Sequence, residues 1–174
     1  MMNSTIKDMI ERRSFRAYTD KIPSEELLDA VIEAGLYAAN GRGKQSPIII
    51  SVTDKKLRDR LSELNSKYCR TPMDDPFYGA PAVLAVLADR EVPTAVYDGS
   101  LVMGNLMLAA HTLGLGSCWI HRALEVFDSN EGKEILHSLG IEGDYEGIGF
   151  CIIGYPANEL PSPPARREGR VFKI

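Results

Sequence analysis

The stretch VYDGSLVMGNLMLAAHTLGLGSCWI, residues 96–120, decides the fold expected of this chain. Its first part, 96–113, is apolar on nearly every side, which predicts a long helix at the centre of the molecule. Gly114 and Gly116 end this helix, and the apolar run 117–120 then predicts a buried strand. Such a helix needs a partner on most of its faces, and the remaining residues have to provide it.

The segments on either side alternate between helical and strand patterns. Helices are expected over 4–12, 24–36, 55–67 and 128–139, the last capped by Asp128, and strands over 48–53, 82–88 and 147–153. Three separate prolines, at positions 72, 76 and 81, make 69–81 an irregular loop, and four prolines keep the tail from residue 155 extended. The pattern predicts one mixed α/β layered domain over 1–174, with an extended C-terminal tail. The central helix and the tail also favour a homodimer.

Composition and missing motifs exclude several classes of protein. The net charge of −4 argues against a nucleic-acid partner, and no apolar run approaches the ~20 residues of a membrane helix. The N-terminus lacks the apolar core of a signal peptide, so a cytoplasmic location is expected. The three cysteines are scattered and the three histidines lack ligand spacing, so neither a disulfide framework nor a metal site is expected. The phosphate-binding loop and the dinucleotide-binding glycine motif are both missing from the sequence.

One basic cluster stands out, the run RRSFR at residues 12–16, directly after the first expected helix. Guanidinium groups bind a phosphate through paired donors and a serine hydroxyl adds another, so the run is a candidate phosphate site. The tail is also basic, with Arg166 and Arg167, while the residues between the two ends are acidic. Two interpretations stay open: the basic ends converge on one anion, or they are solvated surface segments.

The order of five segments extends this observation. They are IERRSFRAYTDKIPSEELLDAVIEAGLYAAN (10–40), GRGKQSP (41–47), DPFYGAP (75–81), YDGSLVMGNLMLAAHTLGLGSCWIHR (97–122) and GFCIIGYP (149–156). In this order they resemble the nitroreductase family over nearly the whole chain, and its short members most of all. The resemblance implies an α+β sandwich with a central mixed sheet flanked by helices. It also implies an intimate homodimer and one flavin mononucleotide (FMN) in each of two clefts between the subunits.

For the basic residues, the resemblance implies separate tasks. Arg12 and Ser14 would hold the FMN phosphate and ribityl chain, and Arg13 would add a contact between them. Arg16 matches the basic position near the pyrimidine edge of the flavin, where a fixed cation stabilises the more negative, reduced state. In the tail, a pair of arginines, Arg166 and Arg167, matches a second basic grip on the phosphate.

In the family, the loop after the second helix touches the flavin of the partner subunit. Here Asn40 stands where the family has a serine and Gly43 where it has an asparagine, while Gln45 matches and the family's tryptophan is absent. The contacts of this loop therefore differ from the family's pattern.

Two further segments match parts of the family's cleft. The strand end with Trp119, Ile120, His121 and Arg122 matches the segment whose backbone lies along the flavin N5 edge, although the sequence by itself favours a plain core turn and strand over 114–120. In the loop over 68–79, Phe77 and Tyr78 are candidate substrate lids, and their alternative role is to anchor the loop in the core.

The activity that the resemblance implies is hydride transfer in two half-reactions, from a reduced nicotinamide through flavin N5 to a small acceptor such as a nitroaromatic or a quinone. No side chain is assigned a catalytic role, because the flavin carries the chemistry. Other flavin reactions, namely dehalogenation, enoate reduction and flavin fragmentation, are alternatives on the same cofactor. A non-enzymatic FMN-binding redox module and an unrelated α/β domain with basic ends are the remaining alternatives.

Overall fold

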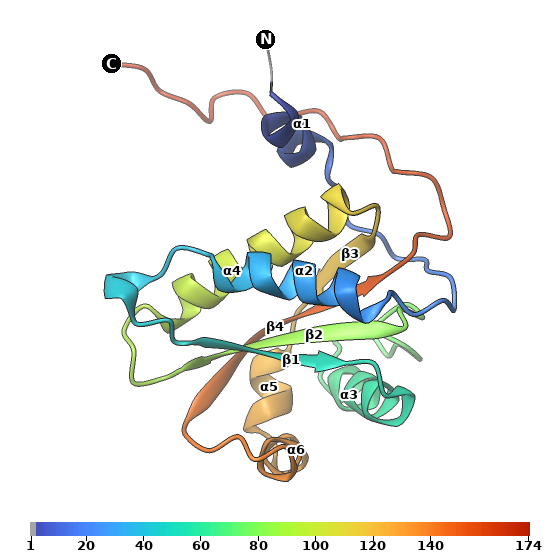
Figure 1. The fold of residues 1–174 in the computed structure, drawn as a ribbon, viewed down its shortest axis with the longest axis vertical. Helices are drawn as coiled ribbons and strands as arrows, with labels where there is room; N and C mark the ends of the chain where they lie inside the picture. Colours follow the sequence, from blue (N-terminus) through green and yellow to red (C-terminus); the bar gives the residue numbers. More distant parts are fainter. Residues whose placement is uncertain (1–2) are drawn as a thin grey trace.

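The structure, a computed structural model, describes residues 3–174 and is built around one four-stranded sheet (Figure 1). The strands are β1 (Pro47–Val52), β2 (Ala82–Asp89), β3 (Gly116–Ile120) and β4 (Tyr145–Gly154), in the order β1-β2-β4-β3. Their pairings are all antiparallel, so the expectation of a mixed sheet was wrong. A parallel bridge joins Ser14 to Ser117 outside these strands.

The antiparallel direction of β2 follows from the loop that precedes it. Helix α3 (Lys55–Lys67) leaves from the end of β1, and the loop over 68–81 then carries the chain back to the start of this helix. There the carbonyl of Ala80 accepts a hydrogen bond of 2.9 Å from Arg58 Nε in the first turn of α3. Strand β2 therefore begins where β1 ended, with Val83 opposite Val52, and runs in the opposite direction.

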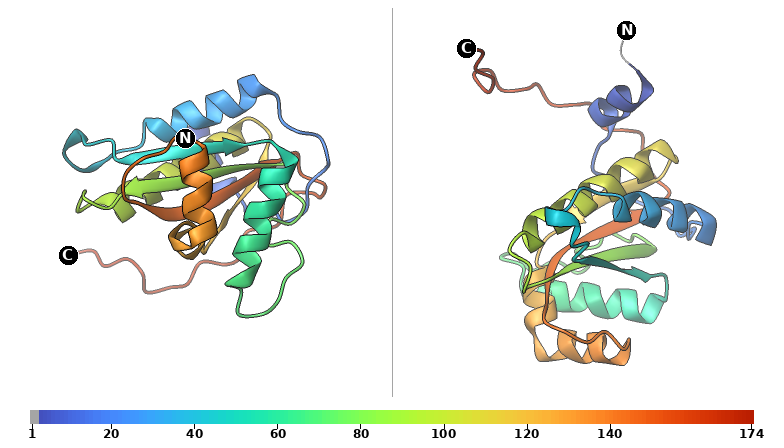
Figure 2. Two further views of the ribbon diagram at one scale, coloured as in Figure 1. Left: turned by 90° about the horizontal axis from the view of Figure 1, so that it is seen from below. Right: turned by 60° about the vertical axis from the view of Figure 1, so that its left-hand side comes forward.

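Helices cover both faces of the sheet. On one face lie α2 (Glu25–Leu36) and α4 (Ala95–Thr112), and on the other lie α3, α5 (Ala123–Asp128) and α6 (Asn130–Ser138), as the right-hand view of Figure 2 shows. Strand β2 lies in the middle, and residues 82–88 are fully buried. The continuous apolar run predicted this two-sided burial, because a strand between two helical layers has no solvent face.

The expected helix over 128–139 is two helices. The helical conformation is interrupted at Ser129. The hydroxyl of this residue accepts a hydrogen bond of 3.0 Å from the Gly132 backbone N–H and so caps α6. Helix α5 was not expected, because its six residues are too few for a clear apolar period. The predicted cap, Asp128, is instead the last residue of α5.

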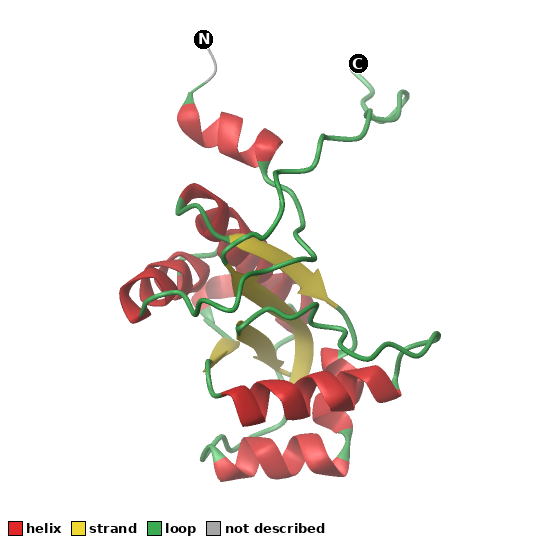
Figure 3. Ribbon diagram, turned by 90° about the vertical axis from the view of Figure 1, so that its right-hand side faces the viewer, coloured by secondary structure: helices red, strands yellow, loops and turns green. Residues whose placement is uncertain are grey.

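Two segments project from the sandwich, as Figure 3 shows. Helix α1 (Ser4–Glu11) contributes nothing to the buried core, and Ile6, Met9 and Ile10 on its surface are about half exposed. The tail is extended and exposed from residue 157 onward, as its prolines predicted. Both segments carry apolar side chains that find no cover within the described part of one chain.

The cysteines belong to the framework. Cys118 and Cys151 are buried, and Cys69 is half-buried. Burial, together with the nearby Cys118, raises the pKa of the Cys151 thiol to about 12, although the positive charge of Arg12 opposes this rise. A thiol with such a pKa stays protonated and inert at neutral pH. None of the helices in residues 3–174 combines the length and apolarity that crossing a membrane requires.

Candidate functional site

The basic run follows α1 and is fixed against the free edge of β3. Ser14 forms a parallel bridge with Ser117, and the Phe15 N–H donates to the Ser117 carbonyl at 3.0 Å. The Phe15 side chain packs against Gly116, where an added Cβ would lie 3.0 Å from the ring. The run is therefore held by a strand of the sheet, which gives its side chains a rigid base.

Two arginines of this run have buried donors without acceptors. Arg12 Nη1 and Arg13 Nε are out of contact with solvent and have no hydrogen-bond partner in residues 3–174. Another donor of Arg13, Nη1, bonds the carbonyls of Ile10 at 2.7 Å and Arg12 at 2.6 Å. Leaving a buried donor unpaired costs about 1–3 kcal/mol, more when it is charged, so the place favours an anion that accepts these bonds. A phosphate group fits this donor set.

The strand end beyond β3 lies next to the basic run, since both are attached to the same strand. The Trp119 indole Nε1 is buried without a partner among the described residues, and its ring covers Gly149. Ile120 is buried, whereas His121 is exposed. The Arg122 side chain turns away toward α3, where its Nε and Nη2 donate to Asn65 Oδ1 at 3.1 and 2.9 Å. The Arg122 guanidinium is therefore engaged by Asn65, whereas the His121 side chain of the same segment stays exposed.

The two candidate lids in the proline-rich loop over 68–81 differ in burial. Phe77 is fully buried, with its ring centroid 5.1 Å from that of Phe150, so its assignment as a lid was wrong. A side chain locked in the core cannot swing over a cleft. Tyr78 is half-buried, and the Arg16 guanidinium carbon lies 5.9 Å from its ring centroid. Tyr78 thus remains a candidate lid beside the basic run.

A single carboxylate holds this loop in place. Asp75 accepts hydrogen bonds from Arg58 Nη2 at 2.6 Å and Ser62 Oγ at 2.5 Å, and from the backbone N–H groups of Phe77 at 2.9 Å and Gly79 at 2.6 Å. Burial raises the pKa of Asp75, but these hydrogen bonds, first of all that from Arg58, outweigh it and lower the pKa below its usual value. The ionised form of Asp75 is therefore the one that stabilises the fold.

This pKa gives a testable pH dependence. Because the folded-state pKa is depressed, the stabilisation is present above the unfolded-state pKa of about 3.9 and is lost as the pH falls through the folded-state value. Asp75→Asn should lower the free energy of unfolding by about 2–3 kcal/mol at pH 7. It should also flatten the loss of stability below about pH 4, as measured by urea unfolding across pH. The matched control is Asp59→Asn, because Asp59 is a partly exposed partner of the same Arg58 and should cost under about 1 kcal/mol. Equal losses in both variants would contradict the role of Asp75.

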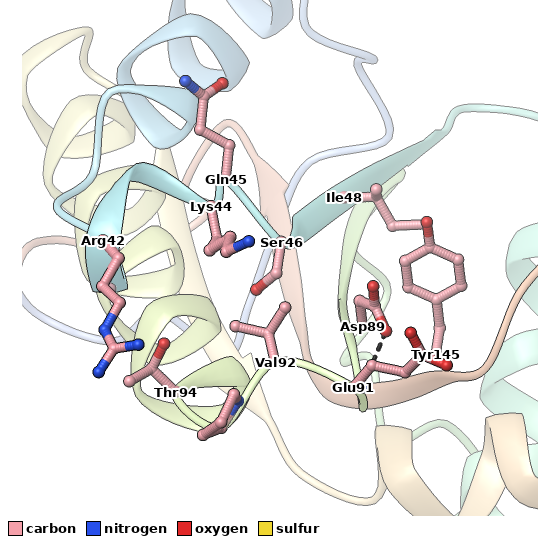
Figure 4. Close-up of a pocket in the computed structure, with 12 residues that line it drawn as sticks. Arg42, Lys44, Gln45, Ser46, Ile48, Asp89, Glu91, Val92, Thr94 and Tyr145 are labelled. Carbon is pink, nitrogen blue, oxygen red and sulfur yellow. Dashed lines mark hydrogen bonds between the residues drawn. The ribbon is translucent and has the colours of Figure 1, made fainter.

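The loop with Asn40 and Gln45 lies away from the basic run, at the N-terminal end of α4. Its Gly41 N–H donates to the buried Asp98 of α4 at 2.9 Å, and Asn40 Oδ1 accepts from the Gln45 N–H at 3.0 Å. The loop lines a cavity of about 540 Å³ together with the residues before α4 (Figure 4). The cavity wall includes Arg42, Lys44 and the buried Ser46 hydroxyl, which has no hydrogen-bond partner in the described part of the chain.

One chain does not bring all the predicted site residues together. The basic run lies beyond the C-terminal end of α4, and the loop over 40–45 lies at its N-terminal end. Between them lies α4, whose 18 residues at 1.5 Å per residue make a helix about 27 Å long. Arg166 and Arg167 lie in the exposed tail and form no hydrogen bond or ion pair with the rest of residues 3–174.

Backbone strain marks the same segments. The non-glycine residues with positive φ are Arg42 (55°), Gln45 (49°), Tyr78 (53°) and Arg122 (73°). All four belong to segments that the sequence had singled out, and such conformations persist where the surrounding structure has a use for them. Sequence reasoning missed the polar residues that hold these segments, namely the buried Asn65 and Asp98 and the half-buried Asp75. Their signal was a polar residue on the apolar side of a helix or within a turn.

Among residues 3–174, the His, Cys, Asp and Glu side chains form no cluster that could hold a metal ion.

Comparison with known proteins agrees with this arrangement. Residues 9–159 match the sequence model of the nitroreductase family. The FMN reductase (NAD(P)H) of Bacillus subtilis strain 168 is 26% identical over 185 residues, covering 94% of this chain and 70% of the relative. A nitroreductase from Bacteroides fragilis, solved with bound FMN, has a TM-score of 0.88 at 26% identity and covers 99% of this chain and 100% of its own.

An FMN-dependent nitroreductase from Clostridium difficile R20291 is 30% identical with a TM-score of 0.76, covering 95% of this chain and 94% of its own. The match to the family model spans the basic run, the loop at 40–45, the strand end and the sheet between them. This chain belongs to the nitroreductase family.

Proposed function

We propose that this protein is an FMN-dependent oxidoreductase that takes hydride from a reduced nicotinamide and delivers it to a small acceptor, such as a nitroaromatic or a quinone. The observation that carries the proposal is Arg12 Nη1, in the basic run on the edge of β3, which is buried and has no hydrogen-bond partner among residues 3–174. This donor set fits a phosphate, and relatives of this chain are named for FMN and NAD(P)H. We also propose a cytoplasmic location, where reduced nicotinamides are available.

The residues of this chain divide the work of binding. Arg12, Arg13 and Ser14 would hold the phosphate and the adjoining ribityl chain, and the backbone of 119–122 would lie along the ring. When bound, FMN supplies a nitrogen, N5, that accepts and donates hydride. The protein then contributes orientation and a fixed positive field, because the flavin itself carries the chemistry of hydride transfer.

We propose that the working form is a homodimer, because the site is incomplete in one chain. A second copy packed along α4 in the opposite direction would bring its 40–45 loop to the basic run of the first. The surface of α4 suits such packing, since Val96, Tyr97 and Leu101 are 51%, 72% and 50% exposed. Contiguous apolar surface of this kind marks an interaction site. The exposed apolar side chains of α1 would be covered in the same assembly.

The test of the activity is spectroscopic. The purified protein should be yellow, or should bind added FMN with one equivalent per chain, and anaerobic NADH or NADPH should bleach the bound flavin. Adding a quinone or nitroaromatic should then restore the colour over repeated cycles. Failure to bind FMN would overturn the proposal, and bound FMN that no nicotinamide reduces would favour a non-enzymatic redox module.

Arg16 should control the charge balance of the bound flavin. Its exposed guanidinium lies over Tyr78 and not with the buried donors of Arg12 and Arg13. A cation near the ring favours the more negative, reduced state by about 1.5–3 kcal/mol. Arg16→Met should therefore lower the midpoint potential of bound FMN by ~30–60 mV, while Arg16→Lys should retain much of it. A redox titration at saturating FMN measures this. An unchanged potential with a raised FMN dissociation constant would assign Arg16 to the phosphate instead.

A further inference from the structure

Asn65, in the last turn of α3, is completely buried, and both its amide nitrogen and its amide oxygen form hydrogen bonds with the strand end beyond β3. Its Nδ2 donates to the His121 carbonyl at 2.6 Å. Its Oδ1 accepts from Arg122 Nε at 3.1 Å and from Arg122 Nη2 at 2.9 Å. One neutral side chain thus ties a helix on one face of the sheet to two consecutive residues of the candidate site.

The backbone that Asn65 holds would not keep its shape by itself. Arg122 has a φ of 73° and precedes the first residue of α5. This left-handed region favours glycine, because other side chains crowd the backbone there. The long Arg122 side chain is anchored by folding back onto Asn65. From the opposite side, β4 approaches so closely that a Cβ on Gly147 would lie 2.2 Å from the Ala123 carbonyl oxygen.

Asparagine is suited to this place because it both donates and accepts while remaining neutral. Aspartate would accept from Arg122 but would leave the His121 carbonyl without its donor. An apolar residue would leave the buried carbonyl and the Arg122 guanidinium both unpaired, which a packed interior disfavours. The polar residue in the core of α3 is therefore explained by what it holds.

We propose that Asn65 is a positioning residue for the cofactor: it sets the peptide groups of His121 and Arg122, and through them the edge that residues 119–122 present to FMN. This inference rests on the proposed function. Asn65 itself is fully enclosed by the chain and acts only through these two residues. The proposal separates ring placement, which depends on Asn65, from the phosphate grip, which depends on the basic run.

The experiment compares Asn65→Ala with a control on the same helix, Leu61→Val, which loosens the same core cluster without removing a hydrogen bond to the strand end. FMN and riboflavin dissociation constants are measured for each, and the visible spectrum and midpoint potential are recorded at saturating FMN. Asn65→Ala should weaken FMN and riboflavin by the same factor, about tenfold, which corresponds to about 1.4 kcal/mol. It should also shift the spectrum and the potential, whereas Leu61→Val should change only the melting temperature.

A double-mutant cycle with Arg122→Gly tests whether Asn65 acts on the cofactor through Arg122. Glycine adopts the positive φ without an anchored side chain, so Asn65→Ala should shift the potential less in the Arg122→Gly background than in the wild type. If Asn65→Ala at saturating FMN keeps the wild-type spectrum and potential, Asn65 is only a structural residue and the inference is overturned. A wild-type protein that binds no flavin would instead overturn the proposed function. The failure of the proposed function therefore shows in the wild type, and the failure of the Asn65 inference shows only in the variant.

Discussion

A chain that ends at Leu160 should be monomeric and should lose most of its flavin. The tail it lacks carries Val171 and Phe172, which are 75% and 86% exposed in one chain, together with the basic pair Arg166 and Arg167. Beyond the hydrogen bond from the Ala157 N–H to the Ala17 carbonyl at 3.1 Å, the tail leaves its own sandwich. Burying each large apolar side chain on a second copy contributes about 1.5–3 kcal/mol, so several of them decide whether the dimer persists.

Sedimentation or light scattering measures the mass of the shortened protein, and FMN titration measures its affinity. The control is a full-length Arg166→Ala, Arg167→Ala double variant, which removes the charges and keeps the apolar contacts. This variant should remain dimeric while binding FMN more weakly, because only the second grip on the phosphate is lost. A shortened chain that stays dimeric and fully flavinated would show that the tail is merely solvated.

Arg12→Ala should weaken FMN binding at least tenfold while leaving riboflavin binding nearly unchanged. A hydrogen bond to a charged group contributes about 1.5–3 kcal/mol, and 1.4 kcal/mol is one factor of ten in the dissociation constant. Riboflavin lacks the phosphate and so does not report this contact. The flavin-free variant should melt at or above the wild-type temperature, because the substitution removes a buried donor that has no acceptor within residues 3–174.

Flavin fluorescence quenching gives both affinities. The matched control is Arg90→Ala, because Arg90 is ion-paired with Asp128 and Asp144 near the opposite end of the sheet. This control should bind FMN as the wild type does. Equal affinities of the wild-type protein for FMN and riboflavin would remove the phosphate assignment altogether.

Several parts of this protein were readable from the sequence because they depend on neighbouring residues. Helix α3 has the expected bounds, since Asp54 Oδ1 accepts a hydrogen bond of 2.8 Å from the Leu57 N–H and so caps the N-terminus of the helix. The buried strand β2 was visible as an unbroken apolar run. The basic run at 12–16 was visible as a candidate anion site because its charges are adjacent, and the structure adds that two of their donors are buried and unpartnered.

The remaining features were decided by tertiary structure, because they join residues that are far apart in the chain. Asn65 looks like any polar helix residue until His121 and Arg122, 56 and 57 positions away, arrive beside it. Phe77 and Tyr78 are adjacent aromatic residues, and only the Asp75 turn sends one into the core and the other toward Arg16.

The direction of β2 and the division of the site were also beyond the sequence pattern. Periodicity records which side of a segment is buried, but neither the partner that buries it nor the direction in which the next strand runs. The loop over 68–81 returns the chain to the start of α3 and makes β2 antiparallel to β1. Helix α4, about 27 Å long, keeps the 40–45 loop near its N-terminal end apart from the basic run beyond its C-terminal end. A continuous helix has a fixed rise per residue and cannot fold its two ends together.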